Sequence, residues 1–95
     1  MSKITKSARG EHCQIRIPGV CNFNPDTTVF AHLNGGGMGI KSSDLHGAYA
    51  CSACHDEVDG RTRVIENRDF VKIWLYDGVF RTQKILLEKG LISVA

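Results

Sequence analysis

The sequence has no long hydrophobic run. No stretch of its 95 residues approaches the roughly 20 consecutive apolar residues that cross a bilayer. The first residues, Met-Ser-Lys-Ile-Thr-Lys, also lack the apolar segment of a secretory signal peptide. We therefore predict a protein that does not associate with membranes and that works in a reducing cytoplasm.

Internal repeats, low-complexity tracts and linkers are absent too, which predicts a single domain over residues 1–95. The pattern G-x-x-x-x-G-K-[ST] is missing, so a P-loop for nucleotides is not indicated. The glycine-rich segment 34–39 is instead expected to be a flexible loop. A domain of this size buries a modest core, and a metal ion or a cross-link is expected to stabilise it.

The chain does contain four cysteines, and their positions indicate a metal site. Cys51 and Cys54 form a C-x₂-C pair, which puts two sulfurs on one tight turn at a separation that suits tetrahedral Zn²⁺. Cys13 and Cys21 form a second pair, joined by a segment that turns at Pro18-Gly19. We predict a closed structural zinc site with these four ligands. Disulfides, the alternative, are rare in a reducing compartment.

The charges are distributed unevenly along the chain. Residues 1–20 carry four basic side chains against one acid, giving +3, and residues 61–95 carry seven against four, again +3. Residues 21–60 hold one lysine against five acids, giving −4. Basic flanks around an acidic middle fit a cation site within a phosphate-binding surface, although ordinary solvated faces would produce the same pattern.

Two strands and a short helix are predicted for the middle of the chain. Residues 27–33 are rich in β-branched and apolar side chains, and residues 49–52 are a candidate for a second strand. A helix is expected to begin at Ser52 or Ala53 and to end near Gly60. It would carry His55 and Asp59, four residues apart, on one face.

A longer amphipathic helix is predicted over about residues 67–89. Asn67 is a plausible N-cap, and Gly90 follows the last residue. Gly78 is a candidate position for a kink. The apolar stripe of this helix is interpreted as core, and its members are Val71, Trp74, Leu75, Val79, Thr82 and Leu86.

This order of features resembles the HNH, or ββα-metal, nuclease family, and more sharply the small YbcO-type nucleases of prophages. The matching residues are Ala8-Arg9-Gly10, Cys13, Arg16-Ile17-Pro18-Gly19-Val20-Cys21-Asn22, Pro25, Ala31-His32 and Ala50-Cys51-Ser52-Ala53-Cys54-His55-Asp56-Glu57. The resemblance implies an α+β, zinc-stabilised ββα-metal (His-Me finger) domain in a bacterial host cell. Its motif core covers about residues 8–63, with the helix at about 67–89 added.

The resemblance also implies roles for individual residues. His32 matches the general base that activates water against a phosphodiester, a task that suits an imidazole because its ordinary pKa lies near neutral pH. His55 matches the ligand of a divalent catalytic metal, Mg²⁺, Mn²⁺ or Zn²⁺, and Asp59 is the expected second ligand.

Two positions depart from the family pattern. Many HNH sites place Asp or His directly before the general base, as a further metal ligand, and this chain has Ala31 there. The middle Asn is also missing, and either Asp44 or His46 matches its position. We favour Asp44, which could hold the ring of His32 by a hydrogen bond.

The expected function is therefore a metal-dependent endonuclease that hydrolyses DNA. A zinc-stabilised module that binds nucleic acid or protein without cleavage is the alternative, and a purely structural zinc domain is the third interpretation. Whether a recombination or replication protein acts with it stays open, as do the substrate form and the oligomeric state. Candidate phosphate contacts are Lys3, Lys6, Arg9, Arg16, Arg61 and Arg63.

Overall fold

The computed structural model describes residues 3–33 and 44–94, and the predicted glycine-rich loop at 34–39 lies outside them. The elements in chain order are α1 (Lys3–Lys6), a 3₁₀ turn η1 (Pro25–Thr27), β1 (Val29–His32), β2 (Gly47–Ala50), α2 (Ser52–Val58) and α3 (Arg68–Glu88). The fold is thus a small α+β fold with one two-stranded sheet, as predicted. None of the described helices is both long enough and apolar enough to cross a membrane.

The two strands are antiparallel, and β1 is shorter than predicted. It begins at Val29 and not at Thr27. The side chain of Asn24 accepts a hydrogen bond from the amide of Asp26, and Pro25 presets the backbone of the first turn residue, so the chain forms a 3₁₀ turn through Thr27. Here local turn chemistry outweighs the β propensity of threonine.

The second strand covers residues 47–50 and ends before Ser52, which begins α2 as predicted. Cys51 ends the strand because its sulfur accepts the amide hydrogen of Cys54, at 3.4 Å, and so caps α2. Opposite His32 in the sheet lies Gly47. A Cβ atom at Gly47 would lie 2.3 Å from the ring of Phe30, so the close packing across the sheet requires glycine there.

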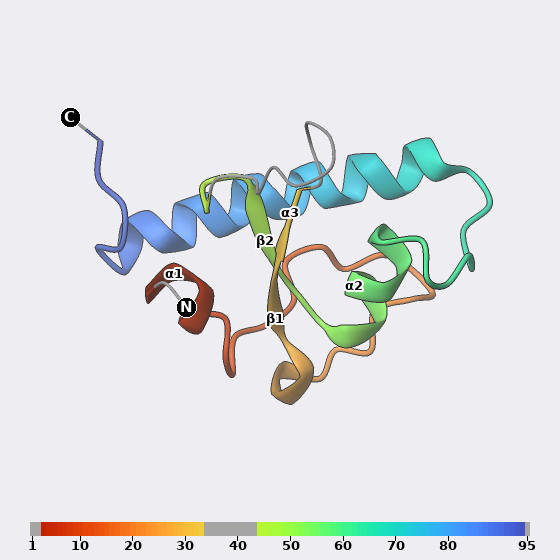
Figure 1. The fold of residues 1–95 in the computed structure, drawn as a ribbon, viewed down its shortest axis with the longest axis horizontal. Coiled ribbons are helices and arrows are strands. Elements are labelled where there is room, and N and C mark those ends of the chain that lie inside the picture. Colours follow the sequence, from red (N-terminus) through yellow and green to blue (C-terminus); the bar gives the residue numbers. More distant parts are fainter. Residues whose placement is uncertain (1–2, 34–43, 95) are drawn as a thin grey trace.

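Helix α3 crosses the short two-stranded sheet and packs against β2, and both chain termini lie at the same end of the molecule (Figure 1). Asn67 is its N-cap, as predicted, and accepts a hydrogen bond from the amide of Asp69 at 3.0 Å. The predicted stripe does form the core, since Val71, Val79, Thr82 and Leu86 are buried and Trp74 and Leu75 are partly buried against it.

Two contacts fix α3 to the rest of the domain. The hydroxyl of Thr82 accepts the amide hydrogen of Tyr49 at 3.0 Å and donates to the carbonyl of Gly78 at 2.7 Å, which ties β2 to the helix. Arg81 donates two hydrogen bonds to the carbonyl of Gln14, at 3.1 and 2.8 Å. Together they place the loop that carries Cys13 against the helix.

Gly78 does not break α3, which continues through it to Glu88. Its role is instead to let the loop of residues 13–17 approach. A Cβ atom at Gly78 would lie 2.8 Å from Cγ1 of Ile15 and 3.0 Å from its Cα, which are distances that real contacts almost never show. Glycine at this position therefore permits a close helix–loop contact.

A buried ion pair joins α2 to the start of α3. Glu57 is fully buried, and its carboxylate accepts hydrogen bonds from the amides of Val64 and Ile65, the hydroxyl of Thr62 and the guanidinium of Arg68 at 2.9 Å. Burial acts to raise the pKa of Glu57, but these hydrogen bonds outweigh it and lower the pKa to about 2. The carboxylate thereby organises residues 60–67, which have no regular structure of their own.

We expect Glu57→Gln to destabilise the protein by about 3 kcal/mol, since it removes the buried carboxylate that the partly exposed guanidinium of Arg68 and the amides of Val64 and Ile65 bind. Urea unfolding at pH 7 measures this loss. Glu66→Gln, an exposed acid in the same loop, is the matched control and should change stability by less than about 0.5 kcal/mol. Equal stabilities for the two variants would contradict a structural role for Glu57.

The contribution of the Glu57–Arg68 ion pair to stability depends on pH. Because the pKa of Glu57 falls from 4.5 to about 2 on folding, its contribution is complete above about pH 4.5 and is lost as the pH drops toward 2. The stability difference between the wild type and Glu57→Gln should therefore shrink on acidification through that range. Taking the difference in stability between the two proteins at each pH removes the effect of the other titrating groups, which both proteins contain.

Candidate active site and zinc centre

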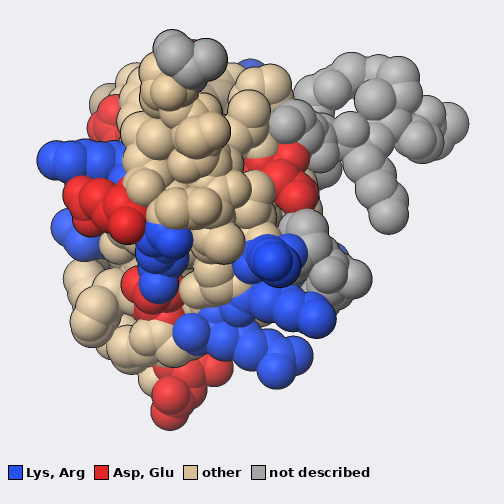
Figure 2. Space-filling model, turned by 90° about the vertical axis from the view of Figure 1, so that its left-hand side faces the viewer, with Lys and Arg blue, Asp and Glu red and all other residues tan. Residues whose placement is uncertain are grey.

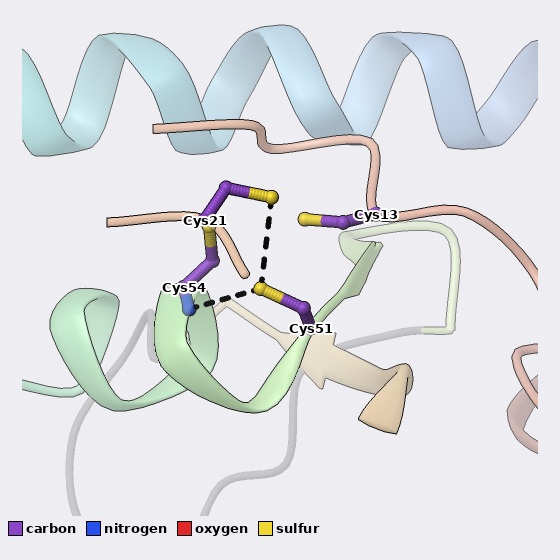
Figure 3. A group of neighbouring side chains, drawn as sticks. All are labelled: Cys13, Cys21, Cys51 and Cys54. Carbon is purple, nitrogen blue, oxygen red and sulfur yellow. Dashed lines mark hydrogen bonds between the residues drawn. The ribbon is translucent and has the colours of Figure 1, made fainter. Parts of the chain in front are cut away.

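The four cysteines come together at one point, although they belong to two distant parts of the chain. Cys13 and Cys21 lie in the loop that precedes η1, whereas Cys51 and Cys54 flank the first turn of α2. Figure 3 shows their sulfurs pointing toward one another beneath α3. All four sulfur atoms lie within 4.8 Å of one another, and no disulfide is formed among them.

These distances fit a zinc ion. Sulfurs bound to tetrahedral zinc at about 2.3 Å lie about 3.8 Å apart, whereas the sulfurs of a disulfide lie about 2 Å apart. The sulfurs of Cys21 and Cys51 are 3.8 Å apart. The predicted ligand set is therefore brought together in a geometry that could hold a structural metal such as zinc.

The protonation of the cysteines points the same way. The hydrogen bond from Cys54 lowers the pKa of Cys13 to about 4, whereas the same contact and burial raise the pKa of Cys54. Burial also raises the pKa of Cys21 to about 11. Cys13 and Cys54 thus share a hydrogen bond that favours the thiolate on Cys13, and a bound cation would favour the thiolate form of its ligands further.

His32 is held at the end of β1 from two sides. Its Nε2 atom lies 2.8 Å from Oδ1 of Asp44, and the ring of Phe30 contacts it edge-on, with centroids 5.0 Å apart. About a third of the side chains of both His32 and Asp44 is exposed. Since a carboxylate can only accept, Nε2 is the donor in this pair, and in the neutral imidazole Nδ1 then keeps its lone pair.

A second histidine–carboxylate pair lies on α2. Nε2 of His55 is 3.4 Å from Oδ2 of Asp59, which caps the helix one turn later. Arg61 lies within 4.0 Å of the same Asp59 oxygen and 3.5 Å from Asp56. The pair thus offers one nitrogen and one oxygen donor on one helix face, partly exposed and beside a positive charge.

His32 and Asp59 line one cleft with a volume of about 230 Å³. Its other walls are Leu33, Val58 and three residues of α3, which are Lys72, Leu75 and Tyr76. The cleft therefore has a histidine from β1 on one side, an acid from α2 on another, and a lysine and a tyrosine from the long helix on the third. Such a wall, with apolar side chains around a few polar and charged groups, is typical of a ligand site.

Two positions that were ambiguous in the sequence have different surroundings. Asp44 contacts His32, whereas His46 is exposed, and its carbonyl accepts a backbone hydrogen bond from Leu33. Of these two side chains, Asp44 is the one that contacts His32. Ala31 is 1% exposed and packs in the core beside the cysteines, so this position contributes no donor atom to the cleft.

The predicted phosphate contacts are spread over the surface. Lys3 and Lys6 are exposed on α1, at the end of the molecule away from α2 (Figure 1), and Arg9 is exposed just after them. Figure 2 views that end and shows Lys and Arg side chains gathered in its lower half. Arg63 is exposed after α2.

Arg16, another predicted phosphate contact, is exposed and also contacts Cys13. Its guanidinium donates to the carbonyl of Cys13 at 3.0 Å, and its amide donates to the sulfur of Cys13 at 3.5 Å. The backbone of Arg16 has a φ of 55°, a left-handed conformation that bends the chain around Cys13. This residue therefore shapes the cysteine cluster as well as facing solvent.

Lys72 and Tyr76 were missed by the sequence reasoning, because α3 was interpreted only through its core stripe. Their spacing of four residues, next to Val71 and Leu75 of that stripe, was the available signal for a second face beside the core. Glu57 was also missed as a buried residue. No local pattern connects it with Arg68, which lies eleven residues away in sequence.

Comparisons with known proteins place the chain in a family. Residues 2–91 match the sequence profile of the family described as "Putative nuclease YbcO". Two curated relatives, from Escherichia coli (strain K12) and from Enterobacteria phage 82, carry the same description. Each is 47% identical over 96 residues, which covers 98% of this chain and 99% of the relative.

A solved structure is similar as well. It is described as "Structure of a putative bacteriophage protein from Escherichia coli str. K-12 substr. MG1655", with a TM-score of 0.80 and 47% sequence identity over 92% of this chain and 99% of that one. The chain thus resembles these proteins in sequence, in length and in fold. The chain belongs to the phage-associated YbcO nuclease family, whose members are named as nucleases on a putative basis.

Proposed function

We propose that this chain is a metal-dependent endonuclease of the HNH type that hydrolyses phosphodiester bonds in DNA. The observation that carries the proposal is the shared cleft, which is lined by both His32 at the end of β1 and Asp59 at the end of α2. The order β1, β2, α2 is the ββα order of that superfamily. The names of the relatives support a nuclease as well.

His32 is the proposed general base. Asp44 holds the Nε2 proton, at 2.8 Å, so that the free lone pair of Nδ1 can take a proton from an attacking water. The carboxylate also stabilises the imidazolium that forms. Asp44 is therefore a positioning residue, and the edge-on ring of Phe30 restricts the imidazole on its other side.

His55 and Asp59 are the proposed ligands of the catalytic metal. Their donor atoms are 3.4 Å apart on one face, and a nitrogen with a carboxylate oxygen suits Mn²⁺, Zn²⁺ or Mg²⁺. A divalent cation held there would act as a Lewis acid toward the phosphate oxygens. Two protein donors leave positions for water and phosphate, and Arg61 beside Asp59 helps to neutralise the acid before a metal binds.

The specific observation that favours a second candidate is Ala31. Its burial in the core leaves the cleft without the third donor that many HNH sites have. Under this alternative, the domain binds nucleic acid without cutting it. Salt-dependent binding of DNA together with no cleavage in any divalent metal would support that reading and contradict ours.

A plasmid-nicking assay tests the proposal. We expect the zinc-loaded protein to nick supercoiled DNA in at least one of Mg²⁺, Mn²⁺ or Zn²⁺, and His55→Ala to lower the rate by about 100-fold because a metal ligand is lost. Asp59→Asn should have a smaller effect in the same direction. Asp56→Asn, an acid of the same helix outside the pair, is the matched control and should retain activity.

A further inference from the structure

Helix α3 exposes large apolar side chains on the face opposite the core. Phe80 is 67% exposed and Tyr76 is 47% exposed, and Phe70, Ile73 and Leu87 on the same helix are also exposed. Single exposed apolar residues are common, but several aromatic and aliphatic side chains along one helix of a small domain indicate a binding surface. Their arrangement shows what kind of ligand fits.

Four of the exposed residues of α3 form one row of basic and aromatic side chains. Lys72, Tyr76, Phe80 and Lys84 follow each other at intervals of four residues, so they lie along one ridge of the helix, about 6 Å apart per step. We call them the α3 row. Two aromatic side chains thus lie between two lysines, and neither lysine forms an ion pair within the described ranges.

The α3 row begins inside the candidate cleft. Lys72 and Tyr76 line it together with His32 and Asp59, whereas Phe80 and Lys84 continue along the outer surface of the helix. A nucleic acid whose phosphate reaches His32 would therefore contact the first two residues of the row and could follow the rest. The surface is continuous with the site of the proposed reaction.

We propose that the α3 row binds single-stranded DNA and guides it through the cleft, an inference that rests on the proposed nuclease function. The two lysines contact phosphates, and the rings of Tyr76 and Phe80 stack on unpaired bases. In a duplex the base faces are covered by their neighbours, so exposed rings gain little there. An unpaired strand presents both faces of each base and a flexible backbone that can follow the helix.

An acidic residue next to the α3 row allows a test in which the affinity for DNA should increase. Asp77 is exposed three residues before Phe80, on the adjacent part of the helix surface. Its carboxylate repels a bound phosphate backbone, so Asp77→Asn should strengthen single-strand binding, whereas Lys72→Gln and Lys84→Gln should weaken it. A purely apolar contact with another protein would not produce this pattern.

The experiment measures DNA binding separately from cleavage. The zinc-loaded full chain carrying His32→Ala is titrated, without added divalent metal, into a fluorescent oligothymidylate of about 12 nucleotides and into a mixed-sequence duplex of equal length. We expect the single strand to bind about tenfold more tightly than the duplex. Tyr76→Ala and Phe80→Ala should each weaken single-strand binding by about fivefold or more. Tyr76→Phe should retain binding.

Phe70→Ala is the matched control, because Phe70 is an exposed aromatic residue of the same helix outside the α3 row. It should leave the affinity unchanged. Each lysine variant should also reduce the slope of log affinity against log salt by about 0.7. Equal affinity for single strand and duplex, or the same affinity for Tyr76→Ala and Phe70→Ala, would overturn the inference.

A second copy of the chain is the rival occupant of this face, since Ile73 and Leu87 are exposed on it, each two helical turns from Phe80. Sedimentation equilibrium decides between the two. A dimer that Phe80→Ala dissociates, with unchanged single-strand affinity per chain, would contradict our inference. If the α3 row binds single-stranded DNA but no metal supports cleavage, the inference about the row stands and the proposed nuclease function is rejected. If the protein cleaves duplex DNA but the α3 row does not bind single strands, the nuclease function stands and the inference about the row is rejected.

Discussion

Cys51→Ser is expected to release bound zinc and to abolish the cooperative thermal transition of this protein. Each pair of ligands comes from a different part of the chain, and the loop that carries Cys13 and Cys21 has little secondary structure of its own. A structural zinc site contributes about 10–16 kcal/mol in small zinc domains, which equals or exceeds the net stability of a typical domain. Loss of one ligand therefore removes more free energy than the remaining core supplies.

Zinc quantification and circular dichroism melting measure this effect. Ser52→Ala is the matched control, since Ser52 lies between the two cysteines of α2, is exposed and accepts a single hydrogen bond from Asn22. It should keep its zinc and lose about 1 kcal/mol at most. A chelator should unfold the wild type, and added zinc should refold it. A fully folded, zinc-free protein with four titratable thiols would disprove the structural site.

The chelation experiment also bears on the candidate active site. Cys51 links the end of β2 to the first turn of α2, and α2 carries His55 and Asp59. If the cysteine cluster opens, the cleft wall formed by Asp59 is no longer held against His32. We therefore expect zinc loss to remove DNA cleavage and the single-strand binding of the α3 row together.

His32→Ala is expected to lower the rate of DNA cleavage by about 100-fold to 10,000-fold, the range that general-base catalysis contributes. The variant should still fold, because about a third of the side chain is exposed and β1 is held by its own ladder and by Phe30. Asp44→Asn should have a smaller effect, about 10-fold to 100-fold, since the amide still contacts the ring but does not stabilise the imidazolium.

Single-turnover nicking rates with each metal measure these losses. His12→Ala is the matched control, because His12 is exposed and does not line the cleft. Affinity for DNA, measured in parallel, should be the same for His32→Ala and the wild type, which separates a catalytic loss from misfolding. Equal rates for His32→Ala and the wild type in every metal would rule out the proposed mechanism.

Local patterns in the sequence were sufficient for the elements that depend on near neighbours. Asn67 caps α3 and the stripe from Val71 to Leu86 is buried, because helix periodicity and capping act over a few residues. The C-x₂-C spacing likewise predicted a turn that places Cys51 and Cys54 close together. The strand ends were less accurate, since the turn at Pro25 and the cap at Cys51 shortened or shifted them.

Residue identity and spacing by themselves predicted two strands, two helices and a four-cysteine cluster, and the resemblance to the HNH family implied the two candidate histidines. Only the tertiary structure placed Asp44 on His32, brought Asp59 into the same cleft, and added Lys72 and Tyr76 as its third wall. These contacts join residues that are distant in sequence, so they depend on how the sheet, α2 and α3 pack. That packing depends on details such as the missing side chain at Gly78, which no local pattern reveals.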